Sequence, residues 1–263
     1  MVSSTRDRLM PDIDHCYIED FSRALECDFA CHELLEKARW PDGFVCPKCD
    51  CNRGYRLPEY GLTQCANCRY QVSATAGTIF HASHVPLKKW FLTILLITAD
   101  KGGVSALRLH RLLDVSYKTA LLMLRKLRTV MGKQNASQII DCVGFGLKTI
   151  LRGIDKQPVQ AFFMTTEDDQ WPRKICLVAK GYADYLKLEQ SPQASSKSNR
   201  LLVAGAVGLV KQFFLGTYHR TSKLYLQDYL DEFAYRFNCQ KPSQTLRKFI
   251  YDCLRANSST SEA

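Results

Sequence analysis

The stretch CPKCDCNRGYRLPEYGLTQCANC, residues 46–68, contains two C-x-x-C motifs separated by fifteen residues. Two such motifs on hairpin turns can hold four thiolates in a tetrahedron around Zn²⁺ and leave no coordination position open. The spacing therefore predicts a structural zinc site in a zinc ribbon over residues 44–80, with the ligands Cys46, Cys49, Cys65 and Cys68. The alternatives are a redox pair or ordinary buried cysteines, and Cys51 is a spare thiol beside Cys49.

The composition indicates a basic globular protein. Its 263 residues include 36 Lys and Arg against 26 Asp and Glu, a net charge of +10. This balance favours a polyanionic partner, although it also fits a basic surface that is merely soluble. The longest apolar stretch, residues 201–216, is too short to span a bilayer and contains Lys211. We expect a cytoplasmic protein without a membrane partner, in which clustered cysteines bind metal rather than form disulfides.

The hydrophobic spacing divides the rest of the chain. A helical lead-in is expected at residues 17–43, where RWPDG stops the helix, and helical spacing returns over residues 86–131. The polar stretch GKQNAS, residues 132–137, reads as a linker. Strand-like runs follow at residues 138–143, 159–166 and 173–179, and then a helical tail. The expected fold class is α+β and multidomain, with a last α/β domain over residues 138–255.

The segment from Ser105 to Met131 has the length and punctuation of a helix-turn-helix, with Ser116 as the N-cap of its second helix. In such a motif the second helix enters the major groove of DNA. Its apolar face is predicted to comprise Ala120, Met123, Leu124, Leu127, Val130 and Met131. The DNA-contacting candidates are Tyr117, Lys118 and Thr119 at its start, and Arg125 and Lys126 on its basic face. The alternative is an ordinary antiparallel helix pair with a solvated basic face.

Asp141 is a single carboxylate in the apolar run SQIIDCVGFG, residues 137–146. An aspartate at the edge of a buried strand is costly unless it is paired, hydrogen-bonded or bound to a metal. Asp141 is therefore a candidate metal ligand.

Four segments, RWPDGFVCPKCD, QCANCRYQVSATAGTIF, KGGVSALRLHRLLDVSYKTALLMLRKLR and GTYHRTSKLYLQDYLDEFAYRFN, resemble a known family. It comprises bacterial insertion-sequence transposases with a zinc ribbon ahead of an RNase H-like DDE domain, related to the Merlin elements. The resemblance covers most of residues 21–238. It implies that the amino-terminal half recognises double-stranded DNA at the element's terminal repeats, and that the carboxy-terminal domain cuts and joins target DNA. It also implies a homo-oligomer, two catalytic Mg²⁺ ions and a bacterial, nucleoid-associated location.

The resemblance aligns Asp141 with the first catalytic aspartate and Lys211 with a family lysine. The other two acidic positions are not matched. Leu209 stands at the third, and the second is either Lys180 or lost, with SPQASSKSNR in its place. Substitute carboxylates exist at Glu167, Asp168, Asp169 and Asp184. We therefore expect a truncated domain with an impaired catalytic site and no secure Mg²⁺ site. The alternatives are an active transposase with unrecognised carboxylates, a non-catalytic DNA-binding regulator, and a second domain that does not fold.

Overall fold

The computed structural model contains two compact units. One comprises Met1–Ile94 with Leu246–Ala263, and the other comprises Leu95–Thr245. The structure describes residues 25–100, 102–137, 142–149, 158–164, 174–179, 208–210, 212–218, 225–239 and 242–255. Across these ranges, no helix has both the length and the apolar character needed to cross a membrane.

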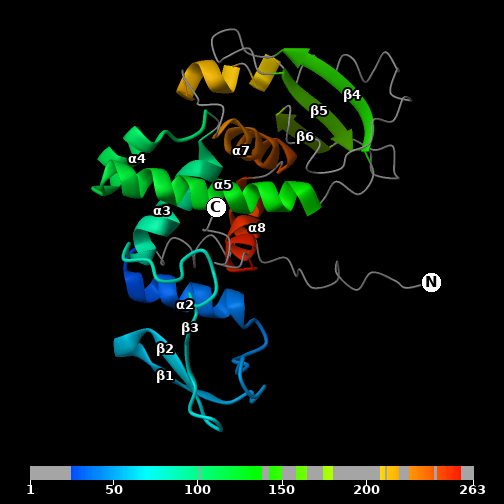
Figure 1. The fold of residues 1–263 in the computed structure, drawn as a ribbon. Helices are drawn as coiled ribbons and strands as arrows, with labels where there is room; N and C mark the ends of the chain where they lie inside the picture. Colours follow the sequence, from blue (N-terminus) through cyan, green and yellow to red (C-terminus); the bar gives the residue numbers. More distant parts are fainter. Residues whose placement is uncertain are drawn as a thin grey trace, which may run out of the picture. The chain divides into compact units, whose positions relative to one another are not determined.

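The first unit contains a small antiparallel sheet, in the order β1-β2-β3, beside helix α2 (Asp28–Arg39) (Figure 1). The strands are β1 (Gly54–Leu57), β2 (Leu62–Cys65) and β3 (Gln71–Ser73). The 3-10 turn η1 (Pro58–Tyr60) and Gly61 reverse the chain between β1 and β2. Gly61 has a φ of 60°, a left-handed conformation that glycine adopts without steric cost. Helix α2 ends at Arg39, as the RWPDG stop signal predicted.

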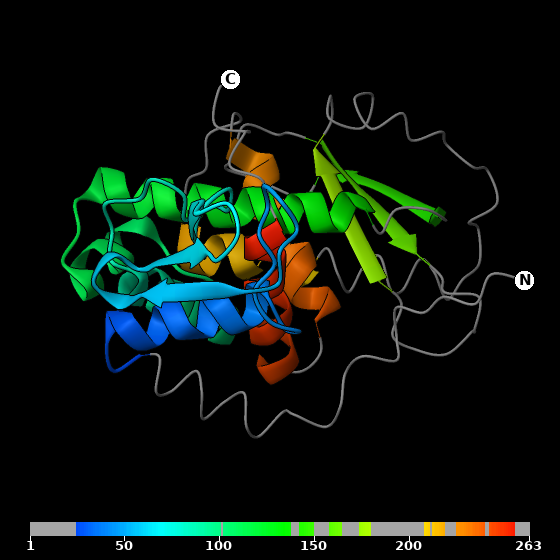
Figure 2. The same cartoon turned by 90° about the horizontal axis from the view of Figure 1, so that it is seen from below.

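Polar contacts attach α2 to the sheet, and the two run alongside each other (Figure 2). The Arg39 guanidinium donates hydrogen bonds to three carbonyl oxygens at the end of β3, those of Ser73 (3.2 Å), Ala74 (2.8 Å) and Ala76 (2.6 Å). Arg56 of β1 forms ion pairs with two glutamates of α2, Glu33 at 2.9 Å and Glu36 at 3.2 Å. One face of the ribbon sheet is therefore covered by α2.

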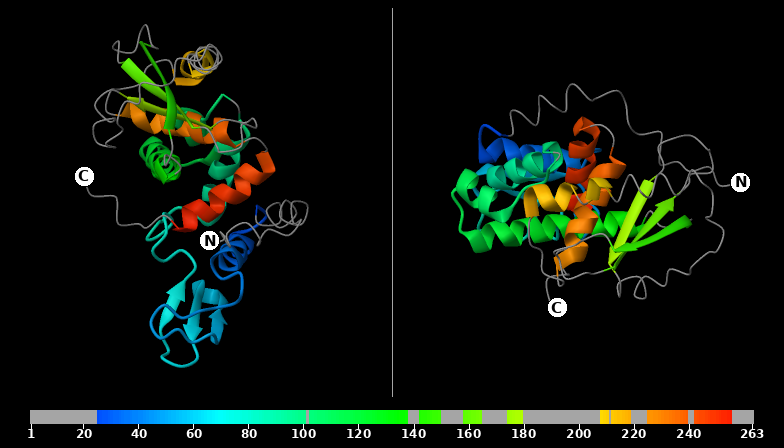
Figure 3. Two further views of the ribbon diagram at one scale, coloured as in Figure 1. Left: turned by 90° about the vertical axis from the view of Figure 1, so that its right-hand side faces the viewer. Right: turned by 90° about the horizontal axis from the view of Figure 1, so that it is seen from above.

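The second unit is built around three helices, α4 (Ala106–Leu113), α5 (Tyr117–Ser137) and α7 (Leu226–Asn238). Helix α5 packs against both α4 and α7 (Figure 3). The short π-helix η2 (Phe214–Tyr218) precedes α7. Two further helices, α3 (Leu87–Ala99) and α8 (Pro242–Arg255), each run from one unit into the other.

A second antiparallel sheet, in the order β4-β5-β6, also lies in this unit, and α7 contacts β6. Strands β5 (Pro158–Met164) and β6 (Lys174–Ala179) match the expected strands at 159–166 and 173–179. Strand β4 (Cys142–Thr149) begins later than the run expected at 138–143. Helices with small antiparallel sheets agree with the expected α+β class. The RNase H-like assignment of this domain stays a prediction.

The linker expected at residues 132–137 is wrong, because this segment is the last part of α5. The Asn135 side chain is buried and donates a 2.9 Å hydrogen bond to the carbonyl oxygen of Asp231 in α7. Gly132 lies so close to α7 that a Cβ atom there would be 2.5 Å from an Asp231 carboxylate oxygen. The glycine thus permits a close helix contact instead of a chain break.

An ionic cluster lies in the core of the second unit. Arg128 of α5 donates a 2.8 Å hydrogen bond to Glu232 of α7, and these side chains are only 2% and 0% exposed. The Tyr218 hydroxyl lies 3.2 Å from both Glu232 and the carbonyl oxygen of Val104. The ring of Tyr229 lies 4.1 Å from the guanidinium carbon. Burial opposes the charge of Arg128, but the Glu232 carboxylate outweighs it and raises the pKa of the guanidinium.

Asp231 gives the second unit a predictable pH dependence. Burial raises the pKa of its carboxyl to about 7, whereas an unfolded aspartate has a pKa of about 3.9. Because the folded pKa is raised, the protonated carboxyl stabilises the folded state fully below about pH 4, and this contribution is lost as the pH rises to about 7. We expect Asp231→Asn to raise the free energy of unfolding at pH 8 by a few kcal/mol and to change it little at pH 4.

Urea unfolding of the wild type and the variant at both pH values measures this difference. Other titrating groups are shared by the two proteins and cancel in the comparison. A stability difference between them that stayed the same at pH 4 and pH 8 would contradict the prediction.

Candidate metal centre and nucleic-acid interface

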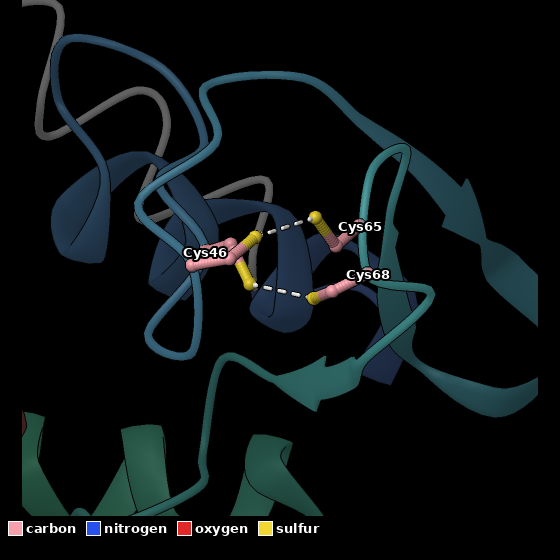
Figure 4. A group of neighbouring side chains, drawn as sticks. Cys46, Cys65 and Cys68 are labelled. Atoms are coloured by element: carbon pink, nitrogen blue, oxygen red, sulfur yellow. Dashed lines mark hydrogen bonds between the residues drawn. The ribbon is translucent and has the colours of Figure 1, made fainter.

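The four predicted cysteines come together at the end of the ribbon sheet. Their sulfur atoms all lie within 4.8 Å of one another. The Sγ atoms of Cys46 and Cys68 are 3.6 Å apart, and those of Cys49 and Cys65 are 3.5 Å apart. Figure 4 shows the sulfurs of Cys65 and Cys68 pointing toward Cys46. Four sulfurs at 2.3 Å from one Zn²⁺ would be about 3.8 Å apart in a tetrahedron, so the cluster has the size that zinc requires.

Two equivalent turns present these thiols. In the first turn, the Lys48 N–H lies 3.4 Å from Cys46 Sγ and the Asp50 N–H donates to the Cys46 carbonyl at 3.0 Å. In the second, the Asn67 N–H lies 3.4 Å from Cys65 Sγ and the Arg69 N–H donates to the Cys65 carbonyl at 3.2 Å. Each turn ends on a residue with positive φ, 55° at Asp50 and 57° at Arg69. The C-x-x-C spacing thus aims two sulfurs from each turn at one point.

The surroundings of Cys65 favour a thiolate ligand. Burial disfavours its charged form, but hydrogen bonds from the backbone N–H groups of Cys68 and Asn67 outweigh burial and lower the pKa of Cys65 to about 6. Metal binding needs this deprotonated form. The spare thiol of Cys51 does not belong to the quartet. Cys51 donates to the Arg53 carbonyl at 3.7 Å, and among the described residues the quartet is the one group of three or more metal-ligating side chains.

Helices α4 and α5 are joined by a short turn, as the helix-turn-helix pattern predicted. Asp114 adopts a left-handed conformation with φ 48°, and His110 Nδ1 lies 2.5 Å from the carbonyl oxygen of Val115. Ser116 caps α5 as expected, because its hydroxyl accepts a 3.0 Å hydrogen bond from the Thr119 N–H. The six residues predicted to form the apolar face of α5 are all 0% or 1% exposed.

The five DNA-contacting candidates differ in how exposed their side chains are. Tyr117 is 52% exposed and Lys118 is also exposed, both at the first turn of α5. Thr119 is partly buried, and its hydroxyl lies 2.8 Å from that of Ser116. Arg125 is exposed, but its guanidinium lies over the ring of Tyr225, 4.7 Å from the centroid. Lys126 is partly buried. The start of the helix is therefore its most accessible part.

Sequence reasoning missed the exposed side chains of α4. Leu107 and Leu112 are 49% and 55% exposed, and Arg111 is exposed beside them. Leu122 of α5 is 53% exposed. The sequence reading assigned faces to the second helix of the motif and none to the first. On a helical projection, Leu107 and Arg111 lie opposite the buried Leu109 and Leu113, and Leu112 lies at the edge of the buried face.

The catalytic candidates Asp141 and Lys211 lie outside the described residues, as do the substitutes Glu167, Asp168, Asp169 and Asp184. Leu209, at the position expected for the third acidic ligand, is described and 48% exposed. A leucine offers no oxygen to Mg²⁺. The described residues therefore do not fit a catalytic Mg²⁺ site, and no catalytic step can be built from them.

Comparisons with known proteins assign two segments of the chain. Residues 26–71 match the family of transposase zinc-ribbon domains of the IS1595 group. Residues 177–238 match the ISXO2-like transposase domain of the same group, a segment that includes Leu209 and Lys211 but not Asp141. An uncharacterized protein in transposable element ISH50 of Halobacterium salinarum is 36% identical over 89 residues. That match covers 33% of this chain and 30% of the relative. No solved structure is a significant match.

Proposed function

We propose, on the premise that this chain carries the zinc-ribbon and ISXO2-like transposase domains of IS1595-group insertion-sequence transposases, that it binds the double-stranded DNA of a mobile element. Its structural zinc is held by Cys46, Cys49, Cys65 and Cys68, in agreement with the matched zinc-ribbon family. The zinc organises the ribbon and leaves no position for a substrate, so it has no direct part in chemistry on DNA.

The observation that carries the proposal is the exposed first turn of α5. In a helix-turn-helix, the first residues of the second helix reach base edges and flanking phosphates. Tyr117 and Lys118 are exposed there, and the Ser116 cap fixes the direction of the helix start. Arg111 adds a second exposed cation on α4. The net charge of +10 supports a polyanionic partner.

The DNA-binding prediction concerns Lys118→Ala in the full zinc-loaded chain. We expect the variant to bind duplex DNA more weakly at every sequence, and its plot of log affinity against log salt to be less steep by about one, the share of a single phosphate contact. The probe is a duplex selected from a random library by the wild type. Fluorescence anisotropy between 50 and 200 mM salt measures the binding.

Lys37→Ala is the matched control, because it removes one exposed lysine from α2 in the other unit. It should leave affinity and salt slope close to those of the wild type. Equal losses from Lys37→Ala and Lys118→Ala would mean that only net charge matters. Wild-type affinity that hardly changed with salt would count against the whole proposal.

We further propose that the catalytic site is impaired. The support is Leu209, which occupies the position where the resemblance expects a metal-binding side chain. The same preparation, incubated with Mg²⁺ and a plasmid that carries the selected duplex, should leave the plasmid strands uncut. Strand cleavage that disappears in Asp141→Ala would instead favour an active transposase that uses other carboxylates.

A further inference from the structure

The register of the ribbon sheet separates its side chains into two faces. Arg56 pairs with Thr63, and Thr63 pairs with Val72, so these three side chains share one face. Thr63 and Val72 are buried, at 8% and 4% exposure, and Arg56 is tied to α2 by its two glutamate partners. Helix α2 covers this face, so it is not accessible to another molecule.

The opposite face carries the row Tyr55, Gln64 and Gln71, one residue from each strand, and we call it the open row. Tyr55 is 66% exposed, Gln71 is exposed and Gln64 is partly buried. Exposed aromatic and amide side chains in one cross-strand row are unusual for a sheet face that only meets water, since tyrosine contributes more when its ring is covered.

Cations flank the open row at the zinc end of the sheet. Arg53 precedes β1, Arg69 lies two residues before Gln71, and Lys48 lies in the first cysteine turn. All three side chains are exposed, and no ion pair involves them within the described part of the chain. Asp50 is the one carboxylate in these two turns. The surroundings of the row are therefore net positive, which suits a polyanionic partner and disfavours a basic one.

The chemistry of the row fits bases as well as phosphates. A glutamine amide has a donor and an acceptor side by side and can pair with adenine N6 and N7 in the major groove, which is wide enough to admit a β-ribbon. A tyrosine ring can pack on sugar or base while its hydroxyl donates to a phosphate. Neighbouring strands are about 4.8 Å apart, so Gln64 and Gln71 could address different base pairs.

We propose that the open row is a second DNA-reading surface, with Gln64 and Gln71 directed at base edges in the major groove, Tyr55 packed on the backbone, and the flanking cations at phosphates. This inference rests on the proposed DNA binding and adds to it a part of the recognised sequence that α5 does not read. The flanking positive charge and the two glutamine amides favour duplex DNA as the partner.

The test is a selection from a random 40-base-pair library of duplexes by the full zinc-loaded chain, repeated with the Gln64→Ala/Gln71→Ala double variant and with Lys118→Ala. We expect the wild type to select two blocks of bases. The double variant should lose the preference at one block only, and its affinity for the wild-type site should fall by about 5- to 150-fold for each paired base lost. Its zinc content should stay equal to that of the wild type.

Tyr60→Ala is the matched control for Tyr55→Ala, because Tyr60 is 72% exposed but lies in η1, outside the row. Only Tyr55→Ala should weaken binding. If the double variant selects both blocks with unchanged affinity while Lys118→Ala binds more weakly, the open row is not a DNA surface, although the proposed function stands. If the wild type selects no duplex at all, the proposed function fails and this inference fails with it.

Discussion

Removal of zinc is expected to unfold the ribbon, residues 44–80, while the helices of the second unit stay folded. The ribbon has only a small core without its metal: apart from cysteines, its buried apolar side chains among the described residues are Val72, Ala74, Ile79 and Phe80. Burying these four side chains stabilises the fold by about 6 kcal/mol. Zinc binding in small structural sites stabilises the folded form by about 10 kcal/mol or more.

Two cysteine variants separate the metal site from ordinary thiol packing. Cys65→Ser removes a ligand that is 1% exposed, and it should reduce zinc content and unfold the ribbon as chelation does. Cys51→Ser removes a thiol outside the quartet, and it should leave zinc content and fold unchanged. Amide spectra of the ribbon by NMR, with and without a chelator, provide the measurement. Well-dispersed ribbon signals in metal-free protein would show that zinc is not required.

Local patterns in the sequence predicted the parts of the structure that depend on near neighbours. The C-x-x-C spacing places two sulfurs on each turn, because a turn of that length directs both side chains to the same side. The apolar residues of α5 were found by their helical spacing, and Ser116 by the preference of helix starts for a hydroxyl. In each case the determining contacts lie within a few residues along the chain.

The parts that were missed depend on contacts between distant segments. The partner of Arg128, Glu232, is 104 residues away, so no local pattern predicted their ion pair. A signal did exist: position 128 lies four residues after Leu124 and three before Met131, on the apolar face of α5. Residues 132–137 were read as a linker for the same reason, since the helix α7 that covers Gly132 and Asn135 could not be foreseen.

Arg128→Ala should be among the most destabilising substitutions in the second unit. It leaves the carboxylate of Glu232, which is 0% exposed, without its principal cation. Removing one partner of a buried ion pair costs about 3–5 kcal/mol, because the other charge stays buried and uncompensated. Arg125→Ala is the matched control. Arg125 lies one helical turn earlier, is exposed, and places its guanidinium over the Tyr225 ring, so its loss should cost about 1 kcal/mol or less.

A double variant tests whether the unpaired carboxylate of Glu232 causes the loss of stability in Arg128→Ala. Arg128→Met/Glu232→Leu replaces both buried charges with apolar side chains of similar length, and it should recover most of the stability lost in Arg128→Ala. Urea unfolding followed by the helical circular dichroism signal gives the three free energies. If the double variant were as unstable as the single one, packing around the guanidinium, which lies 4.1 Å from the Tyr229 ring centroid, would be the larger contribution. Recovery would instead mean that the ion pair fixes which helices meet, α5 with α7, rather than how strongly they hold.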